Sequence, residues 1–317
     1  MRSLPVVLFC FLLLISSVSA ANCKVNASCV SSPAEQQWGG SAVALSVLDS
    51  VVCSGNLINN SKQDGRAYIL TAKHCYTSAG IDDPVLAAEN TKVTWQAVAP
   101  CGSELKAVDH NNSFTSFGAI HRAQYKDMWL IELKEKPKDF WKPWYAGFDS
   151  TNTTLNGKAL SLHYGSNLER QALSSTKINR SDYGWEFVPQ TGGPEPGSSG
   201  SALLDNMGRV VGVLSTGSSC SSGTPYVTYQ TLNEFWYGNG TPETSLQPWL
   251  DPTGNTSHML GKSFTENSIY PEIRSSKQNS VYSGSFYLSS IFLFLAAILI
   301  RITHNSCADM ANPLNRN

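Results

Sequence analysis

The hydrophobic residues between Gly39 and Leu250 occur in short runs that are rich in β-branched and aromatic residues. Gly, Asn, Asp, Ser and Pro separate these runs, and the alternation is typical of β-strands joined by turns. Many short strands over about 200 residues predict an all-β fold built from sandwiches or barrels. The expected strands are Ala42–Leu48, Val51–Ile58, Tyr68–Leu70, Val93–Val98, Met128–Leu133, Ala159–His163, Ala202–Leu204, Val210–Leu214 and Tyr226–Gln230.

The two ends of the chain carry hydrophobic patterns of a different kind. Residues 1–20 combine Arg2, an apolar stretch and the small residues Val18-Ser19-Ala20, as a secretory signal peptide does. Near the other end, residues 261–284 are polar and predict a stalk, and residues 285–302 are largely apolar. No charged residue occurs from Gln278 to Ile300, and a helix of that length, about 34 Å, can cross a bilayer.

Two kinds of membrane attachment compete for this C-terminal end. A transmembrane helix at residues 285–302 leaves residues 303–317 as a short cytosolic tail. A lipid-anchor signal is the alternative, because small residues such as Ser280 and Ser283 precede the apolar run. Such a signal normally ends within its apolar stretch, whereas a polar tail with Arg301 and Arg316 follows here. We therefore expect the transmembrane helix.

Residues 21–260 form the expected main domain, and a turn-rich break divides it. The break at Trp144–Gly157 contains Asp149-Ser150-Thr151-Asn152, which are turn-forming residue types. We expect one barrel over about residues 39–145 and a second over about residues 146–250. A cleft between the two halves is then the expected place for a site.

Charge and cysteine content narrow the class of protein. The 317 residues carry a formal net charge of −1, which gives no electrostatic basis for binding nucleic acid. In a secreted chain the cysteines pair, but Cys10 leaves with the signal peptide and Cys307 lies in the tail. The sequence leaves most pairings open; only Cys53 and Cys75 have a local argument, since they flank one strand-turn-strand unit. The cysteines expected to pair are Cys23, Cys29, Cys53, Cys75, Cys101 and Cys220.

Seven Asn-X-Ser/Thr triplets support the secretory interpretation. All lie between the signal peptide and the apolar tail, in the part expected outside the cytosol, and we expect some of them to carry glycan. They are at Asn26, Asn59, Asn111, Asn152, Asn179, Asn239 and Asn255.

Three polar residues beside the predicted strands form a candidate catalytic set. His74 follows the apolar run Tyr68–Leu70, Asp127 precedes Met128–Leu133, and Ser199 lies in a glycine-bracketed turn before Ala202–Leu204. A serine hydroxyl is a poor nucleophile at neutral pH, so it needs a base, and the base needs a third group to fix its tautomer. The order His, Asp, Ser is that of the chymotrypsin-type triad.

The turn around Ser199 also predicts an oxyanion hole. Backbone amides near the nucleophile must point at the spot where the carbonyl oxygen becomes negative. Gly197 permits such a turn because it lacks a Cβ atom. We therefore expect the amides of Gly197 and Ser199 to be the oxyanion donors.

The chain from about Cys23 to Leu260 resembles the bacterial lysyl endopeptidases of the trypsin-like serine protease superfamily. The resemblance rests on Tyr68-Ile69-Leu70-Thr71-Ala72-Lys73-His74-Cys75, Tyr145-Ala146-Gly147-Phe148-Asp149, Glu195-Pro196-Gly197-Ser198-Ser199-Gly200-Ser201 and Trp249-Leu250-Asp251-Pro252. It implies two packed six-stranded antiparallel β-barrels. It also implies three disulfides, Cys23–Cys220, Cys29–Cys101 and Cys53–Cys75.

The sequence departs from this family where the substrate side chain is recognised. Ser221-Ser222-Gly223-Thr224-Pro225-Tyr226 holds no acid, although the family has a specificity carboxylate after the cysteine equivalent to Cys220. Trypsin's own specificity acid would fall at Gly193. We expect Gly193, Ser215, Thr216 and Gly217 to line the pocket and lysine not to be strongly preferred, because an unpaired buried cation is costly. Glu195 is expected to fix the loop.

The expected function follows from these features. Trypsin is activated when a new N-terminal ammonium pairs with an acid just before the nucleophile, but here that neighbour is Ser198. We expect activity without proteolytic cutting. The chain is predicted to be a membrane-anchored serine endopeptidase of the secretory pathway, at the cell surface or on a lumenal membrane, acting on protein or peptide substrates with no cofactor or metal. A catalytically idle protease fold used as a surface binding module is the alternative.

Overall fold

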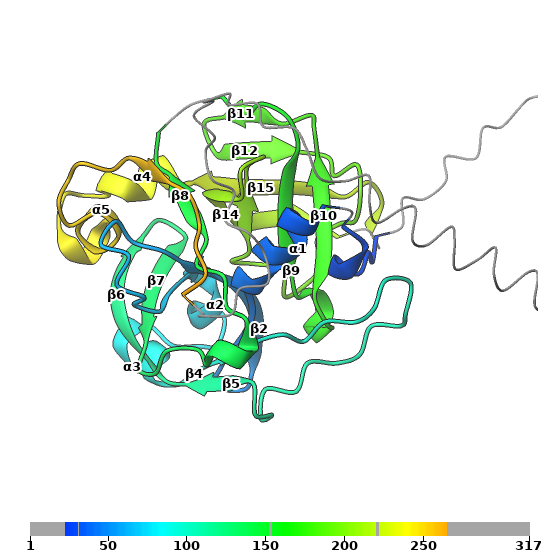
Figure 1. Cartoon of the computed structure of the whole chain (residues 1–317), viewed down its shortest axis with the longest axis horizontal. Coiled ribbons are helices and arrows are strands. Elements are labelled where there is room, and N and C mark those ends of the chain that lie inside the picture. The colour runs from blue at the N-terminus through cyan, green and yellow to red at the C-terminus, as the bar shows by residue number, and fades with distance from the viewer. Residues whose placement is uncertain (1–22, 31, 152–153, 220–221, 265–317) are drawn as a thin grey trace, which may run out of the picture. The chain divides into compact units, whose positions relative to one another are not determined.

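Two curled β-sheets form the described part of the protein. The structure is a computed structural model of the whole chain and describes residues 23–30, 32–151, 154–219 and 222–264. In Figure 1 the strands up to β7 lie below and the strands from β9 to β15 lie above. The strand runs of the sequence therefore assemble into two successive sheets.

The strands and helices are short, as the hydrophobic pattern predicts. The strands are β1 Ala42–Val47, β2 Val51–Ile58, β3 Tyr68–Ala72, β4 Thr91–Thr94, β5 Thr115–Phe117, β6 Ala119–Tyr125, β7 Met128–Leu133, β8 Gly147–Asp149, β9 Ala159–His163, β10 Gln171–Ser175, β11 Asn179–Ser181, β12 Gly184–Phe187, β13 Ala202–Leu204, β14 Arg209–Ser218, β15 Tyr226–Thr231 and β16 His258–Met259. The α-helices are α1 Pro33–Trp38, α2 His74–Thr77, α3 Pro84–Glu89, α4 Leu232–Tyr237 and α5 Gln247–Leu250.

The N-terminal sheet has seven strands in the order β5-β4-β1-β2-β3-β7-β6. Strand β3 lies between β2 and β7, with Leu70 opposite both Asn56 and Leu130. All five residues of β3 are buried. A strand buried on both faces reads as a continuous apolar run, which is why Tyr68–Ala72 stands out in the sequence. The central position of β3 fixes the start of α2, two residues beyond it.

The C-terminal sheet has nine strands, with the path β10-β9-β13-β14-β15-β12-β11 and with β8 and β16 attached to it. Strand β8 pairs in parallel with β14 and antiparallel with β16. The expectation of six strands in each barrel and of purely antiparallel pairing is therefore wrong in detail for the described residues. Short terminal segments such as His258–Met259 add strands that a count of hydrophobic runs does not include.

One large hydrophobic cluster joins the two sheets. It contains Leu45, Ile69 and Trp129 of the N-terminal sheet and Leu160 and Val213 of the C-terminal sheet. A smaller cluster around Trp185, Phe187 and Tyr229 lies within the C-terminal sheet. Because the shared cluster fixes both sheets against each other, loops at their junction keep defined positions.

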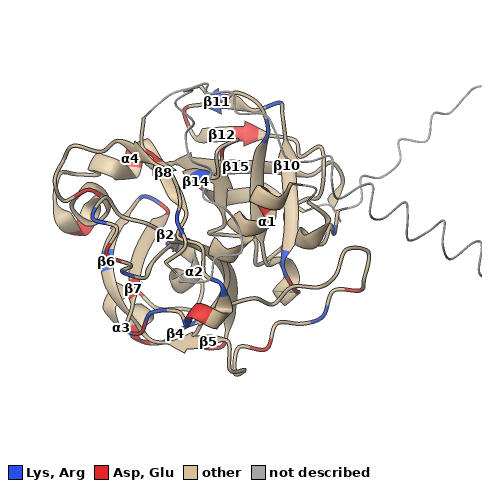
Figure 2. Cartoon of the chain, in the orientation of Figure 1, with Lys and Arg blue, Asp and Glu red and all other residues tan. Residues whose placement is uncertain are grey.

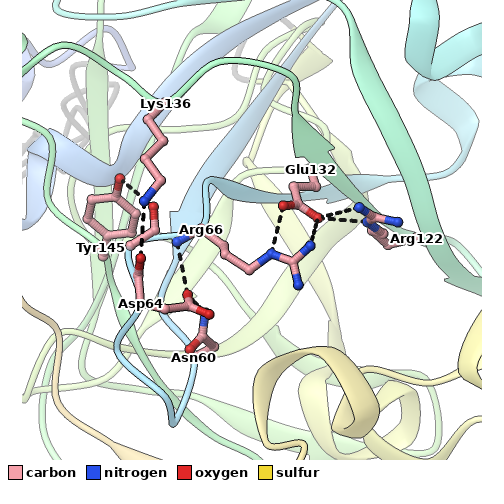
Figure 3. Close-up of polar contacts among 8 residues, drawn as sticks. Asn60, Asp64, Arg66, Arg122, Glu132, Lys136 and Tyr145 are labelled. Carbon is pink, nitrogen blue, oxygen red and sulfur yellow. Dashed lines mark hydrogen bonds and ion pairs between the residues drawn. The ribbon is translucent and has the colours of Figure 1, made fainter.

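An ion-pair network ties the segment before β3 to the N-terminal sheet (Figure 3). Glu132 accepts hydrogen bonds from Arg66 Nε at 2.8 Å and from Arg122 Nε at 2.7 Å. Asp64 Oδ1 in turn accepts from Asn60 Nδ2 at 2.7 Å and from the Arg66 amide at 3.1 Å. These contacts fix the loop from Asn60 to Arg66, which leads into β3, and attach Arg66 to Glu132 of β7.

The predicted signal peptide at residues 1–20, the stalk at 261–284 beyond Phe264, the apolar stretch at 285–302 and the tail at 303–317 lie outside the described residues. Within the described ranges, no helix has the length and apolarity needed to span a membrane. Charges of both signs are spread over both sheets (Figure 2).

Candidate active site

His74 is the first residue of α2 and lies directly beyond the buried strand β3. Its position is fixed by the backbone, because the Lys73 amide donates to the Asp127 carbonyl at 2.9 Å. A disulfide joins the next residue, Cys75, to Cys53 of β2. The imidazole itself stays partly exposed, with 34% of its side-chain surface accessible. His74 is therefore anchored by its main chain and open to a reactant.

Asp127 lies in the turn between β6 and β7, and its side-chain carboxylate accepts three hydrogen bonds. Its Oδ1 accepts from the His74 amide at 2.8 Å, and its Oδ2 lies 2.8 Å from His74 Nδ1. The Ser215 hydroxyl also donates to Oδ2, at 2.5 Å. Since Nδ1 faces a carboxylate, it carries the proton and leaves Nε2 as the basic nitrogen. This is the orientation that a general base needs.

Ser199 lies in the tight turn Gly197–Gly200, which packs against the N-terminal sheet. Its carbonyl accepts from the Ser54 amide at 2.8 Å, and the Gly200 amide donates to the Leu214 carbonyl at 2.9 Å. Gly200 has φ +84°, and a Cβ atom there would lie 2.2 Å from Thr71 Oγ1 and 2.3 Å from the Ser54 carbonyl oxygen. Only glycine fits this approach, which brings the Ser199 turn against β3 just before His74.

The backbone of the turn around Ser199 leaves the N–H groups of the two expected oxyanion donors, Gly197 and Ser199, available. Gly197 has φ +99°, a region that glycine enters at no steric cost. Within the described residues, neither the Gly197 amide nor the Ser199 amide donates to a protein acceptor. A partly buried turn that leaves two N–H groups without an acceptor can bind an oxyanion.

The described residues contain no hydrogen bond between the Ser199 hydroxyl and His74. Ser215, however, lies close to both the His74 partner Asp127 and Ser199. Ser215 donates to Asp127 and also lines a cavity together with Ser199. A nucleophile-to-base contact commonly tightens only when substrate binds. The structure thus brings the three candidate residues to one edge of the junction between the sheets.

Two cavities flank this edge. The first, of about 430 Å³, is lined by Ser199, by Ser215, Thr216 and Gly217 of β14, and by Pro194–Pro196. The expected pocket residue Gly193 is buried and is not among the residues that line this cavity. The second cavity, of about 700 Å³, shares Ser215 and Thr216 and includes Asp127 and Asp182.

Glu195 is the one carboxylate among the described residues that line the first cavity. Its side chain is 11% exposed, and its Oε1 lies 3.4 Å from Lys24 Nζ. Its backbone participates in the turn, since its carbonyl accepts from the Ser198 amide at 2.9 Å. These contacts agree with a loop-fixing residue.

Several residues that position the site are not apparent from the sequence. Ser54 donates to the Gly197 carbonyl at 2.9 Å and accepts from the Tyr164 amide at 2.9 Å. His163 Nδ1 lies 2.8 Å from Ser198 Oγ. The only local signal is a polar residue inside an apolar run, as in Val51–Ile58 and Ala159–His163.

Disulfides are present at Cys53–Cys75 and at Cys29–Cys101. Cys220 lies outside the described residues, so Cys23–Cys220 stays a prediction. Cys53, His74 and Cys75 come close together, but the two sulfur atoms are bonded to each other and are not thiolate ligands.

The structure narrows the set of glycosylation candidates. Asn26 is buried and donates to the Ser103 carbonyl at 3.2 Å, and Asn59 is buried with only 1% of its surface accessible. A glycan needs a position at the protein surface, so we expect the glycosylated subset to lie among the other candidates. Asn152 lies outside the described residues. The exposed candidates are Asn111, Asn179, Asn239 and Asn255.

Known proteins resemble this chain in sequence and fold. The family model of the lysyl endopeptidase C-terminal domain matches residues 18–231. A lysyl endopeptidase of Pseudomonas aeruginosa is 24% identical over 206 residues, which cover 59% of this chain and 42% of that protein. The chain therefore spans less than half the length of this relative.

Solved structures with a similar arrangement include two proteins of the protease type. One is the scabies mite inactivated protease paralogue S-I1, with a TM-score of 0.44 and 16% identity, covering 62% of this chain and 92% of that one. Another is a Glu endopeptidase in complex with MPD, with a TM-score of 0.38 and 17% identity, covering 61% and 85%.

Proposed function

This chain belongs to the family of the lysyl endopeptidase C-terminal domain, within the trypsin-like serine proteases, and we propose that it is an active serine endopeptidase. The single observation that carries the proposal is the Asp127 carboxylate, which accepts from the main chain of His74 and lies 2.8 Å from its Nδ1. A carboxylate so placed orients the imidazole as a general base. Ser199 lies in the turn that packs against Ser54 of β2 and Thr71 of β3, close to the start of α2 at His74.

The proposed reaction is acyl transfer in two steps. Ser199 Oγ attacks the peptide carbonyl carbon while His74 Nε2 takes the hydroxyl proton, and the carbonyl oxygen becomes an oxyanion facing the Gly197 and Ser199 amides. His74 then gives the proton to the leaving amine as the peptide bond breaks. Water, deprotonated by His74, hydrolyses the acyl-enzyme and restores Ser199.

The proposed location is outside the cytosol. The disulfides Cys29–Cys101 and Cys53–Cys75 require an oxidising compartment in most organisms. We further propose that residues 285–302 anchor the protein in the membrane, with the lipid-anchor signal as the alternative. Release of the protein from cells by a phospholipase that cleaves glycolipid anchors supports the alternative, and retention supports a transmembrane helix.

Labelling by a fluorophosphonate tests the activity directly, because only an activated serine reacts with it. We expect the full-length protein to be labelled at Ser199 and the heat-denatured protein not to be labelled. A folded protein that resists labelling and cleaves no peptide would instead be an idle protease fold that serves as a binding module.

A further inference from the structure

The residue before the proposed nucleophile makes a buried contact that the reaction described above does not use. Ser198 is 1% exposed, and its hydroxyl oxygen accepts from the Glu195 amide at 2.9 Å. The same oxygen lies 2.8 Å from Nδ1 of His163, the last residue of β9, which has no accessible surface. A side chain of the C-terminal sheet thus reaches directly into the Ser199 turn.

The contact joins two neutral groups. Burial lowers the pKa of His163 to about 4, and no charged residue contributes to this shift. A neutral imidazole and a hydroxyl can share one proton in either direction, so the hydrogen bond forms in both tautomers. The pair needs no ionised partner to persist at neutral pH.

The pair fixes the residue that lies between the two expected oxyanion donors. A planar trans peptide directs its C=O and N–H groups to opposite sides. The Pro196 carbonyl accepts from the Ser166 amide, so the Gly197 N–H points away from Ser166. The Ser198 carbonyl accepts from the Ser201 amide at 3.1 Å, so the Ser199 N–H points away from Ser201. The Ser199 N–H lies in a peptide that Ser198 itself forms, and the Gly197 N–H is separated from Ser198 only by the backbone of Gly197. Movement of Ser198 would therefore turn the first N–H directly and disturb the second through Gly197.

We propose that His163 and Ser198 form a positioning pair that holds the Gly197 and Ser199 amides ready to bind an oxyanion. In trypsin a charged pair between a new chain terminus and an acid acts at this position, whereas here two side chains of the folded domain do so without charge. The inference rests on the proposed function, since it concerns the same turn.

Substitutions that remove or restore this one hydrogen bond test the pair. His163→Phe keeps the ring but loses Nδ1, and Ser198→Ala loses the hydroxyl. Loss of oxyanion-donor geometry lowers kcat by about 10² to 10³, and we expect KM to change by less than about threefold because ground-state binding is made elsewhere. His163→Asn places an amide nitrogen near the Nδ1 position, and we expect it to recover at least about tenfold of the lost kcat.

A matched control separates positioning from general stability. His121→Phe removes the contact of another, half-buried imidazole, the hydrogen bond that His121 Nδ1 accepts from Trp129 Nε1 at 3.1 Å. It lies on β6, away from the Ser199 turn, so we expect a lower Tm and an unchanged kcat. Affinity for a peptidyl boronate, which forms a tetrahedral adduct, should fall with kcat in the pair variants only.

The outcomes separate the two proposals. Wild-type protein without hydrolysis, at the level of Ser199→Ala, overturns the proposed function itself. Active wild type together with folded pair variants whose kcat lies within about threefold of it overturns the positioning pair alone. If His163→Phe does not fold, Ser198→Ala decides by the same criterion. Failure of both to fold while His121→Phe folds, with no recovery in His163→Asn, assigns the pair to folding and overturns positioning.

Discussion

The two sides of the candidate site are held by different kinds of interaction. On the side of the base, a disulfide anchors the residue after His74 and the Asp127 carboxylate accepts hydrogen bonds from its main chain and its ring. On the side of the nucleophile, neutral hydroxyls hold the turn, Ser54 on the Gly197 carbonyl and Ser198 against His163. One side depends on a charge, and the other avoids charge.

Because of this difference, substitutions on the two sides should impair different steps of the reaction. Neutralising Asp127 should damage the base and leave the turn intact, because Asp127 makes no contact with Gly197 or Ser198 among the described residues. Disturbing the turn should damage oxyanion binding and leave the orientation of His74 intact. Variants of the two sides should therefore fail in distinguishable ways.

The largest effect is expected where the proposed nucleophile, Ser199, is removed. Ser199→Ala should lower kcat by on the order of 10⁶, as loss of the serine does in a comparable triad, while the fold and its Tm stay close to wild type. Steady-state hydrolysis of a peptide library and thermal unfolding measure both quantities. Near-normal hydrolysis by Ser199→Ala would exclude Ser199 as the nucleophile.

Asp127→Asn is the substitution that tests the charged side most directly. The amide keeps the shape of the side chain but presents an N–H group to the His74 ring, which favours the wrong tautomer, and kcat should fall by about 10⁴. Binding of a peptidyl boronate should weaken together with kcat/KM, whereas the Tm should change little. A loss below about tenfold would show that His74 does not depend on this carboxylate.

In both sheets, sequence patterns identified buried strands better than partly exposed ones. Strands β2, β7, β9 and β13 coincide with the expected runs, because their residues are almost entirely buried. Strand β6 was not expected, since Ala119–Tyr125 mixes polar and apolar residues on a partly exposed strand. Strand β14 extends to Ser218 through polar residues that pair with β15.

The candidate site shows the same limit. His74, Asp127 and Ser199 stand in local motifs, and the structure brings them to one edge. Ser54 and Gly197 are separated by 143 positions, and no local pattern connects them. The residues that we propose to carry the chemistry stand out in the sequence, whereas the neutral contacts that hold the turn depend on how two sheets pack.

Lowering the pH below 6.5 should reduce the stability of the neutral side, because this side contains His163. The pKa of His163 is lowered by burial from 6.5 to about 4, so between these values the unfolded chain binds more protons than the native one. Stability from this residue is therefore complete above pH 6.5 and is lost as the pH falls toward 4, by on the order of 3 kcal/mol, or about 10² in the folding equilibrium.

Denaturant unfolding of wild type and His163→Asn at several pH values isolates this contribution, since the carboxylates are common to both. The difference between their free energies of unfolding should shrink as the pH falls from 6.5 to 4. A constant difference over that range would mean that His163 keeps its ordinary pKa.

The pocket between the two sides should not strongly favour lysine. Glu195, the one carboxylate lining the first cavity within the described residues, already lies 3.4 Å from Lys24 Nζ, and a desolvated ammonium without a partner is costly. We expect cleavage after lysine to exceed cleavage after leucine by less than about 10². Cleavage profiling measures the ratio. If the ratio is larger, its loss in Glu195→Gln or in Asp182→Asn identifies the acid.

The smallest effect tests the residue that joins the two sides. Ser215 donates to Asp127 Oδ2 at 2.5 Å from a strand that also lines the first cavity. A hydrogen bond to a charged group contributes about 1.5–3 kcal/mol, but the Asp127 side chain is 21% exposed and keeps both bonds from His74. Ser215→Ala should therefore lower kcat/KM by about tenfold, at the weak end of that range.

A double-mutant cycle shows through which side Ser215 acts. If its hydroxyl serves only to orient Asp127, Ser215→Ala should cost almost nothing further in Asp127→Asn, and the two changes should be strongly non-additive. If the tenfold loss persists in that background and appears in KM, Ser215 acts through the substrate pocket instead. The cycle thus decides whether the neutral side supports the charged one or only lies beside it.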